Sequence, residues 1–305
     1  MIKAIVTGGA GFIGSHMVDL LLEHNLHVTV IDDFSVGSER NLSHINNQNH
    51  LEIIRQDITK LDPDNSAFKD AEFVFHFAGI GDIVPSISNP LLYSEVNILG
   101  TIKVLEAARK SGVKSFVYAA SSSCYGLAKT PTNENHIIDL QHPYSMTKYY
   151  GEQSALKWSN FYNMKINSVR IFNAYGLRSK TSGAYGAVMG VFLRQKIENT
   201  PLTIVGDGSQ TRDFINVKDV VKAFYAVSRI NISGEVFNVG AGKPVSINHL
   251  ASIFDQDFVF IPWRPGEPDC TWADIGKITS FTSWEPEIDF RHGVLEMLDN
   301  IDYWA

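Results

Sequence analysis

Short apolar runs rich in β-branched residues alternate with longer amphipathic segments through the first half of the chain. The apolar runs predict strands at 4–7, 27–32, 51–56, 72–78, 115–121 and 167–172. The longer segments predict helices at 12–24, 91–111 and 144–162. Continuous apolar strands separated by helices are typical of a parallel sheet that helices cover on both faces. The pattern therefore predicts an α/β fold built on a doubly wound parallel sheet.

The rhythm changes after Asn173. A loop with Gly and Ser precedes a predicted helix near 188–199 and a predicted strand at 202–205, and a long tail without clear periodicity follows. The stretch 234–242 reads as one more strand that returns to the first sheet. We therefore predict a first domain at 1–173, to which the chain returns near 211–242, and a smaller α/β lobe made mainly of 174–305.

Composition and charge exclude several classes of function. The 305 residues carry 26 Lys and Arg against 33 Asp and Glu, a net charge of −7, which argues against a general nucleic-acid or membrane-surface binder. The two cysteines, Cys124 and Cys270, have no metal-ligand spacing, so we expect no metal site. Met1 leads directly into an apolar run without a basic region or cleavage site, and no apolar segment reaches spanning length. The expected location is cytoplasmic.

A glycine pattern, Gly8-x-x-Gly11-x-x-Gly14, lies between the first predicted strand and the first predicted helix. Glycines there let the backbone approach a pyrophosphate, whose charge is stabilised at the helix N-terminus. The next strand ends in Asp32 and Asp33, and a carboxylate at that point accepts hydrogen bonds from a ribose 2′-hydroxyl and repels a 2′-phosphate. The first domain is therefore predicted to be a Rossmann-type domain that binds NAD in preference to NADP.

With this motif in place, the chain resembles the extended short-chain dehydrogenase/reductases that act on nucleotide sugars. Within that family its motifs are most similar to those of UDP-glucose and UDP-N-acetylglucosamine 4-epimerases. The resemblance rests on TGGAGFIGS (7–15), QDI (56–58), HFAG (76–79), NILGT (97–101), SSSCYG (121–126), Tyr144-x-x-x-Lys148, RIFNAYG (170–176), GDGSQTRDFINVKDVVKAF (206–224), FNVGAG (237–242) and RPGE (264–267). It covers most of the chain and implies NAD as cofactor and a nucleotide sugar as substrate.

The resemblance also implies a set of cofactor contacts. Asp57 and Ile58 would flank the adenine, Asn97 would line the cofactor channel, and Lys148 would bind the nicotinamide ribose. The full set of implied cofactor-binding residues is Gly8, Gly11, Phe12, Ile13, Gly14, Asp32, Asp33, Asp57, Ile58, Ala78, Asn97 and Lys148.

Tyr144 and Lys148 lie one helical turn apart, about 6 Å along the helix axis. A free tyrosine has a pKa near 10, and a nearby ammonium and the positive ring of oxidised nicotinamide would both favour its phenolate. The alternative is an ordinary exposed i, i+4 pair. The resemblance favours catalysis and adds Ser121 as the hydroxyl that binds the reacting group, with Ser122 or Ser123 as alternatives and Ser122 as a possible substrate contact.

The mechanism that the resemblance implies is transfer of a hydride from C4 of the sugar to NAD while Tyr144 removes the hydroxyl proton. An epimerase then returns the hydride to the other face of a 4-keto sugar. The alternatives are a 4-dehydrogenase or 4,6-dehydratase that releases the keto sugar, and a catalytically silent protein that binds NAD or a sugar nucleotide. Dehydratases carry an Asp-Glu pair where this chain has Ser122-Ser123, which disfavours dehydration.

The second half supplies the expected substrate contacts. By resemblance Arg212 and Arg264 would bind the diphosphate, Asn173 the diphosphate or sugar, and Glu267 a ribose, although Arg212 beside Asp213 could instead form a surface ion pair. The stretch 183–188, which ends at Val188, resembles the loop that holds uracil in UDP-sugar 4-epimerases and favours UDP. A small residue, Thr271, would leave room for a 2-acetamido group on the sugar.

Asp82 departs from the pattern of these epimerases, which have a small or neutral residue there. Its carboxylate would face the sugar, repel a uronic acid and accept hydrogen bonds from hydroxyls, or it would turn outward. Ser86 matches a sugar contact. A homodimer is also implied, formed through the helices near 94–111 and 144–162, although the same apolar faces could belong to an ordinary core.

Overall fold

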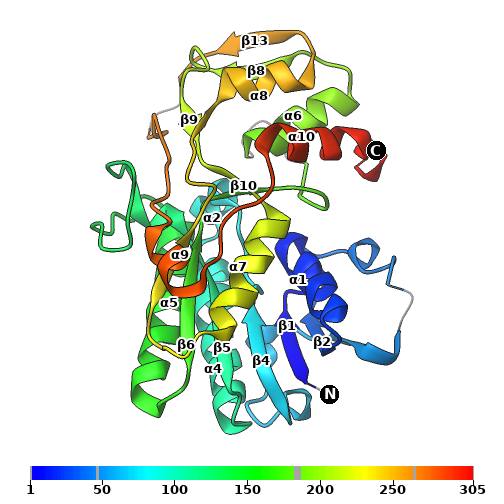
Figure 1. Ribbon diagram of the computed structural model, residues 1–305, viewed down its shortest axis with the longest axis vertical. Coiled ribbons are helices and arrows are strands. Elements are labelled where there is room, and N and C mark those ends of the chain that lie inside the picture. The colour runs from blue at the N-terminus through cyan, green and yellow to red at the C-terminus, as the bar shows by residue number, and fades with distance from the viewer. Residues whose placement is uncertain (1, 46–47, 182–186, 264–265, 305) are drawn as a thin grey trace.

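The computed structural model describes residues 2–45, 48–181, 187–263 and 266–304. It has a larger domain built on one sheet and a smaller lobe beside the carboxyl ends of the strands (Figure 1). The C-terminus lies on the smaller lobe and the N-terminus at the far end of the larger domain.

The central sheet has seven strands in the order β11-β6-β5-β4-β1-β2-β3, and every pairing in it is parallel. Its strands are β1 (Lys3–Thr7), β2 (His27–Asp32), β3 (Leu51–Arg55), β4 (Ala71–His76), β5 (Ser115–Ser121), β6 (Ile166–Ile171) and β11 (Val236–Val239). The predicted α/β class and the predicted strands are confirmed. β11 lies at one edge, paired with β6, so the chain comes back to the sheet after an excursion of more than sixty residues.

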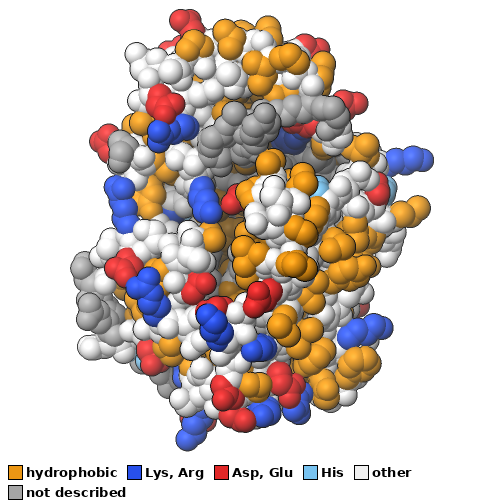
Figure 2. All heavy atoms as spheres, turned by 180° about the vertical axis from the view of Figure 1, so that it is seen from behind, with side chains coloured by type: hydrophobic (Ala, Val, Ile, Leu, Met, Phe, Trp, Pro, Cys, Tyr) orange, Lys and Arg blue, Asp and Glu red, His pale blue; other side chains and the backbone are white. Residues whose placement is uncertain are grey.

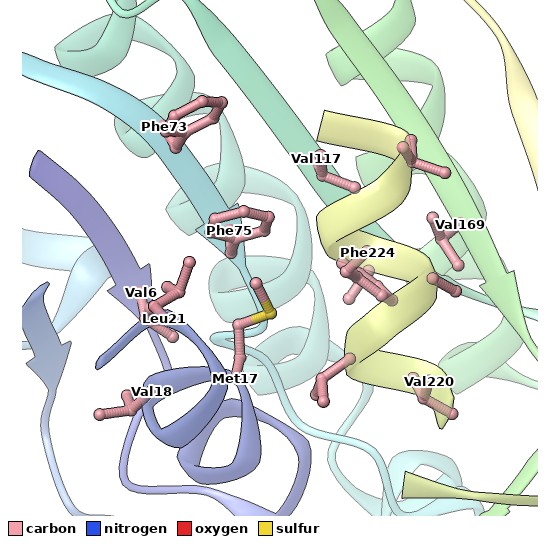
Figure 3. Close-up of a cluster of buried hydrophobic side chains, with 14 of the residues drawn as sticks. Val6, Met17, Val18, Leu21, Phe73, Phe75, Val117, Val169, Val220 and Phe224 are labelled. Carbon is pink, nitrogen blue, oxygen red and sulfur yellow. The ribbon is translucent and has the colours of Figure 1, made fainter. Parts of the chain in front are cut away.

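Helices cover both faces of this sheet. On one face lie α1 (Phe12–Glu23) and α7 (Val217–Arg229), whose side chains meet those of the strands in Figure 3. On the other face lie α4 (Thr101–Lys110) and α5 (Pro143–Tyr162). Both clusters consist of fully or nearly fully buried aliphatic and aromatic side chains. Burial on both faces explains why the strands carry no polar alternation.

Alternation along each strand divides the core into two layers. In β4, Phe73 and Phe75 face α1 and α7, whereas Val74 between them faces α4 and α5. In β1, Val6 and Ile5 divide in the same way. Successive side chains of a strand point to opposite faces, so a shift of register by one residue would exchange the two layers.

The helix predicted at 91–111 is three consecutive segments. They are α3 (Pro90–Ser94), the π-helical turn η5 (Glu95–Gly100) and α4. The π turn lies where α5 approaches closely: a Cβ on Gly151 would come within 2.7 Å of the Asn97 carbonyl oxygen and 2.3 Å of the Tyr118 hydroxyl. Only glycine allows this contact, and π turns of this kind are frequent at functional sites.

The tail after residue 205, expected to be irregular, is largely regular. Besides α7 and β11 it contains α8 (Ile247–Phe254), β13 (Phe258–Ile261), α9 (Gly276–Thr282) and α10 (Phe290–Asp299). α8, α10 and α6 (Val188–Ile197) pack around the pair formed by β8 (Leu202–Val205) and β13. The remaining small pairs are β7 (Asn173–Tyr175) with β10 (Phe214–Asn216), and β9 (Thr211–Arg212) with β12 (Val245–Ser246). Short elements with mixed apolar and polar residues hid this periodicity.

Within the described ranges, no helix combines the length and the apolar character needed to cross a bilayer.

His76, the last residue of β4, generates a test of the core. Its ring is buried between the Thr7 hydroxyl, 2.6 Å from Nδ1, and the Thr101 hydroxyl, 2.9 Å from Nε2. Burial, helped by the positive charge of Lys148, lowers the pKa of His76 from 6.5 to about 3. The unfolded chain therefore binds a proton below pH 6.5 that the folded protein does not, and stability is lost as the pH falls.

We expect the unfolding free-energy difference between wild type and His76→Gln to shrink by roughly 2 kcal/mol from pH 8 to pH 5, measured by urea denaturation. His292→Gln, at an exposed position of α10, is the matched control. An unchanged difference for His76→Gln would show that the ring accepts a proton in the folded protein.

Candidate active site

A cavity of about 500 Å³ opens at the carboxyl ends of the central strands. This is the edge at which parallel α/β sheets bind ligands. Its lining residues are Gly8, Gly11, Ile31, Asp32, Asp33, Ser35, Val36, Gly37, Gln56, Asp57, Ile58, Thr59, Lys60, Phe77, Ala78, Gly79, Ile80, Leu92, Glu95 and Val96. The structure thus brings Gly8, Gly11, Asp32, Asp33, Asp57, Ile58 and Ala78 of the predicted set to one cavity.

The glycine-rich turn between β1 and α1 fits a dinucleotide. Gly8 has φ +71°, and a Cβ there would lie 2.6 Å from the Ala78 amide nitrogen. A Cβ on Gly14 would lie 2.1 Å from the Gly8 carbonyl oxygen, so Gly14 serves the packing of helix on turn. Phe12 and Ile13 begin α1, whose N-cap Gly11 offers no side-chain cap. The first amide groups of the helix are thereby left to stabilise a pyrophosphate.

Asp32 is buried at the end of β2. Its carboxylate accepts hydrogen bonds from the Ala10 amide at 2.9 Å and from the Phe34 amide at 2.8 Å. Burial raises the pKa of Asp32, and these two amides oppose the rise. A carboxylate has about four acceptor sites, so two remain for the hydroxyls of a ribose. Asp33 follows at the cavity wall, and its Oδ1 accepts a 2.6 Å bond from the Ser35 hydroxyl.

Asp57 and Asn97 both act on the backbone around the cavity. Asp57 begins a short 3₁₀ turn by accepting a bond from the Thr59 amide at 2.8 Å, which places Ile58 on the wall. Asn97 is 1% exposed, and its amide bonds both the N–H and the C=O of Ile80 and the Thr147 hydroxyl. Asn97 therefore contributes to the channel through Ile80, as a positioning residue.

The N-terminus of α5 holds Tyr144. His142 and Ser145 form a reciprocal capping box, and Pro143 occupies the first turn, where its missing N–H costs nothing. The His142 and Tyr144 rings stack with an interplanar angle of 4°. The Tyr144 amide donates a 3.1 Å bond to the Ser86 hydroxyl. The backbone and the ring of Tyr144 are thus held by independent contacts.

Ser121, at the end of β5, lies close enough to the Tyr144 phenol for its hydroxyl to favour the phenolate. Its Oγ lies 2.9 Å from that of Ser123, which joins the second serine to the set. Burial raises the pKa of Tyr144, the Ser121 hydroxyl opposes the rise, and the Asp82 carboxylate adds to it. The protein alone therefore favours the neutral phenol, and the prediction that Lys148 and an oxidised nicotinamide together favour the phenolate stays a prediction.

Lys148 is 8% exposed, so the alternative of an ordinary exposed pair is wrong. Its ammonium lies 4.7 Å from the centre of the Tyr118 ring. Burial lowers the pKa of Lys148 to about 8, and Glu152, one turn further along α5, opposes this shift. Glu152 in turn forms a buried pair with Arg170 at 2.6 Å. Lys148 is mostly charged at neutral pH, with few neighbours that neutralise it.

The expected substrate residues of the second half meet at the start of the smaller lobe. The Thr271 hydroxyl accepts a 2.9 Å bond from the Asn173 amide group and a 3.1 Å bond from the backbone amide of Asp213. The buried Arg212 pairs with Glu267 at 3.0 Å, so the alternative of a surface pair with Asp213 is wrong. Glu267 Oε2 is buried without a partner within the described residues. Desolvation lowers the pKa of Arg212, the ordinary consequence of a cation in a buried cleft.

Ser86 holds the Tyr144 backbone. It is fully buried in α2 (Ile83–Ser88), donates to the Ile83 carbonyl and accepts from the Tyr144 amide. These bonds use the hydroxyl proton and one of the two acceptor sites of its oxygen, and the sugar contact stays a prediction. The Asp82 side chain is 52% exposed and lies 3.5 Å from the Lys180 ammonium.

Of the three remaining residues that were predicted to bind the substrate, the structure describes two. Ser122 begins the 3₁₀ turn η6 (Ser122–Tyr125) beside Ser121, and Val188 begins α6, partly buried against the core of the smaller lobe. Arg264 and residues 183–186 of the expected uracil loop lie outside the described residues.

Several cavity residues and one charged partner were not predicted from the sequence. Ser35, Val36 and Gly37 line the cavity directly after Asp33, and their position beyond a strand's carboxyl end was a usable signal. Lys180 is a single lysine in a loop, with no sequence signal for its approach to Asp82. No group of three or more His, Cys, Asp or Glu side chains in the described part of the chain is arranged to hold a metal ion.

Comparisons with known proteins agree with this geometry. The NAD dependent epimerase/dehydratase family matches residues 4–240. A putative UDP-glucose 4-epimerase of Methanocaldococcus jannaschii is 36% identical over 304 residues, 97% of each chain. The solved UDP-N-acetylglucosamine 4-epimerase of Methanobrevibacter ruminantium, in complex with UDP-N-acetylmuramic acid, has TM-score 0.90 and 32% identity over 98% of this chain and 99% of that one.

A second solved structure is the UDP-glucuronic acid 4-epimerase of Bacillus cereus in complex with UDP-glucuronic acid and NAD. It has TM-score 0.91 and 30% identity, and each chain is covered in full. Family match, relatives and fold agree over nearly the whole length, and the chain belongs to the NAD-dependent epimerase/dehydratase family.

Proposed function

We propose that this protein epimerises a UDP-hexose at C4 through a transient 4-keto sugar that stays bound. The observation that carries the proposal is the set formed by Ser121, Tyr144 and Lys148 at the carboxyl ends of the sheet, next to a cavity that fits a dinucleotide. Relatives of similar length that are named 4-epimerases support the same reaction.

NAD, when bound, accepts a hydride from C4 and later returns it. In the forward half, the Tyr144 oxygen takes the proton of the C4 hydroxyl as the C4–H bond breaks, which leaves a C4=O group. Ser121 donates or accepts a hydrogen bond at the same oxygen, so the proton has a short path. The keto sugar then rotates within the site and presents its opposite face. Tyr144 returns the proton to the C4 oxygen, and the C4–H bond forms on that face.

Tyr144 needs positive charge to act as a base. Burial raises its pKa in the protein alone, so the phenolate must be stabilised by groups that come close in the complex. Lys148, held in a dry site beside Tyr118, carries one such charge, and the oxidised nicotinamide carries another. Binding of the cofactor and activation of the base are therefore coupled.

The nucleotide would bind along the smaller lobe. Arg212 presents its planar fork beside Glu267, whose Oε2 has no partner among the residues that the structure describes, and this pair suits a diphosphate followed by a ribose. Asn173 bonds the small side chain of Thr271, and a hexose with or without a 2-acetamido group would bind beside these two residues.

We further propose a homodimer formed through η5, α4 and α5. Leu92, Leu99, Tyr150 and Phe161 of these and adjoining segments are exposed at 46–67%. Figure 2 shows hydrophobic side chains gathered over the larger domain on the face opposite to that of Figure 1. An apolar surface of this kind on neighbouring helices supports burial against a second copy.

Tyr144→Phe tests the catalytic assignment. Purified protein is incubated with UDP-glucose or UDP-N-acetylglucosamine without added NAD, and proton NMR follows the C4 epimer. We expect epimerisation by wild type and a loss of turnover of about 10²- to 10⁴-fold in the variant, because the proton acceptor is gone. Tyr162→Phe, on the same helix, should keep the wild-type rate. Equal rates for Tyr144→Phe and wild type would contradict the proposal.

Thr271→Tyr tests the sugar pocket. A bulky ring should lower kcat/KM for UDP-N-acetylglucosamine at least tenfold more than kcat/KM for UDP-glucose, because it crowds the 2-substituent. Thr271→Val keeps the size and removes the hydroxyl, so it controls for the bonds to Asn173 and Asp213. A parallel loss for both sugars in Thr271→Tyr would place the residue away from the 2-substituent.

A further inference from the structure

The N-terminus of α2 is fastened to the catalytic tyrosine's helix. The Tyr93 hydroxyl donates a 2.6 Å bond to the Asp82 carbonyl, and the Tyr144 amide bonds Ser86, one turn further along α2. These two bonds fix Asp82 about one helical turn, roughly 6 Å, from the point at which α2 touches Tyr144. The backbone of Asp82 is therefore held close to the start of the helix that carries Tyr144.

Lys180 reaches Asp82 from a different part of the fold. Residues 177–180, here called the strap, are fastened to α1: the Leu177 carbonyl lies 2.9 Å from His16 Nε2, and Arg178 pairs with Asp19 at 2.7 Å. At the other end of the strap the Lys180 ammonium lies 3.5 Å from Asp82 Oδ2. The strap thus runs from the helix of the glycine-rich turn to the helix beside Tyr144.

The charges of Asp82 and Lys180 would act differently on a bound sugar. Both side chains are about half exposed, so the pair is weak and can open. Asp82 acts electrostatically on both Tyr144 and Tyr93. A negative charge on a sugar bound beside Tyr144 would consequently be repelled by Asp82, and the half-exposed position of Asp82 screens this repulsion only in part.

We propose that Asp82, partly neutralised by Lys180, is a charge gate that selects nucleotide sugars with an uncharged hexose and rejects uronic acids. This rests on the proposed function, since it names the substrate class of the same site. Lys180 offsets the negative charge of Asp82, so that this charge does not also repel the diphosphate, which the same cleft must accept.

Binding to the NAD-loaded protein tests the gate apart from turnover. Calorimetry should give at least tenfold tighter binding of UDP-glucose than of UDP-glucuronate. Asp82→Asn should reduce that ratio to less than threefold, and Lys180→Gln should widen it, because the carboxylate is then uncompensated. Asp299→Asn, an exposed acid at the end of α10, removes the same charge elsewhere and should leave the ratio as in wild type.

Equal affinities in wild type, or an unchanged ratio in Asp82→Asn, would overturn the gate. The proposed function fails separately: selective binding without formation of any C4 epimer would leave the gate standing and remove epimerisation.

An independent observation concerns residues 300–304, here called the clasp. The Tyr303 hydroxyl donates to Asn41 Oδ1, and the buried Asn41 amide donates a 2.7 Å bond to the Ala10 carbonyl in the glycine-rich turn. The Arg40 guanidinium lies 4.5 Å from the centre of the Tyr303 ring. The clasp also bonds the strap, from the Trp304 indole to the Ser179 carbonyl.

The segment that the clasp holds forms one wall of the cofactor cavity. Ser35, Val36 and Gly37 line that cavity, and the amide of Ser38 donates a 3.0 Å bond to the Ala10 carbonyl. The clasp therefore joins two segments, 35–41 and the strap, to the turn that receives the pyrophosphate. These contacts therefore hold in place the wall that residues 35–37 would present to a bound dinucleotide.

We infer that the clasp slows release of NAD, which a reaction that regenerates its own cofactor requires. Exchange of bound NAD for isotopically labelled NAD, followed by mass spectrometry, is the readout. Tyr303→Ala should exchange at least tenfold faster than wild type, and Tyr303→Phe, which keeps the ring over Arg40, should lie between them. Leu295→Ala, on α10, is the control. Wild-type exchange in Tyr303→Ala with an unchanged Tm would overturn the inference.

Discussion

The carboxylate of Asp213 is the contact on which the architecture beside the active site depends. It is fully buried and accepts hydrogen bonds from the amides of Ala241 at 2.6 Å, Gly242 at 3.1 Å and Ala273 at 2.9 Å. Burial raises the pKa of Asp213 and the three amides oppose the rise, so the ionised form is held by bonds that water would otherwise supply. One side chain thereby joins three segments far apart in sequence.

The consequence reaches the substrate side of the site. Arg212 precedes Asp213, and the Asp213 amide bonds the Thr271 hydroxyl, which in turn bonds Asn173. The residues that would contact the nucleotide and the sugar are therefore held in place through one buried carboxylate at the end of the sheet. The smaller lobe can vary in its outer elements while this junction keeps its inner residues in register with the larger domain.

The catalytic side is organised by α5. The same helix presents Tyr144 at its N-terminus, Lys148 one turn later and Glu152 one turn after that, each toward the sheet. Glu152 bonds Arg170 and the Ser168 hydroxyl on β6, which anchors the helix one turn beyond Lys148. The Lys148 ammonium lies over the Tyr118 ring, and Glu152 is paired with Arg170. In the proposed mechanism this arrangement keeps the positive charge of Lys148 available to stabilise the Tyr144 phenolate.

The chain's own pattern determined the sheet, the glycine-rich turn and the residues expected at its edge, because strand period, helix period and the sterics of glycine are local properties. Gly8 and Asp32 were therefore predicted from motif and spacing, whereas Ser121 was predicted from the family resemblance and Tyr144 from its spacing to Lys148 together with that resemblance. The roles of Ser86, Asn97 and Asp82 were decided only by the tertiary structure, since a serine hydroxyl may serve a sugar or a backbone amide according to what packs against it. The helices after residue 205, the pairing of Lys180 with Asp82 and the junction at Asp213 join segments distant in sequence, and no local signal carries such contacts.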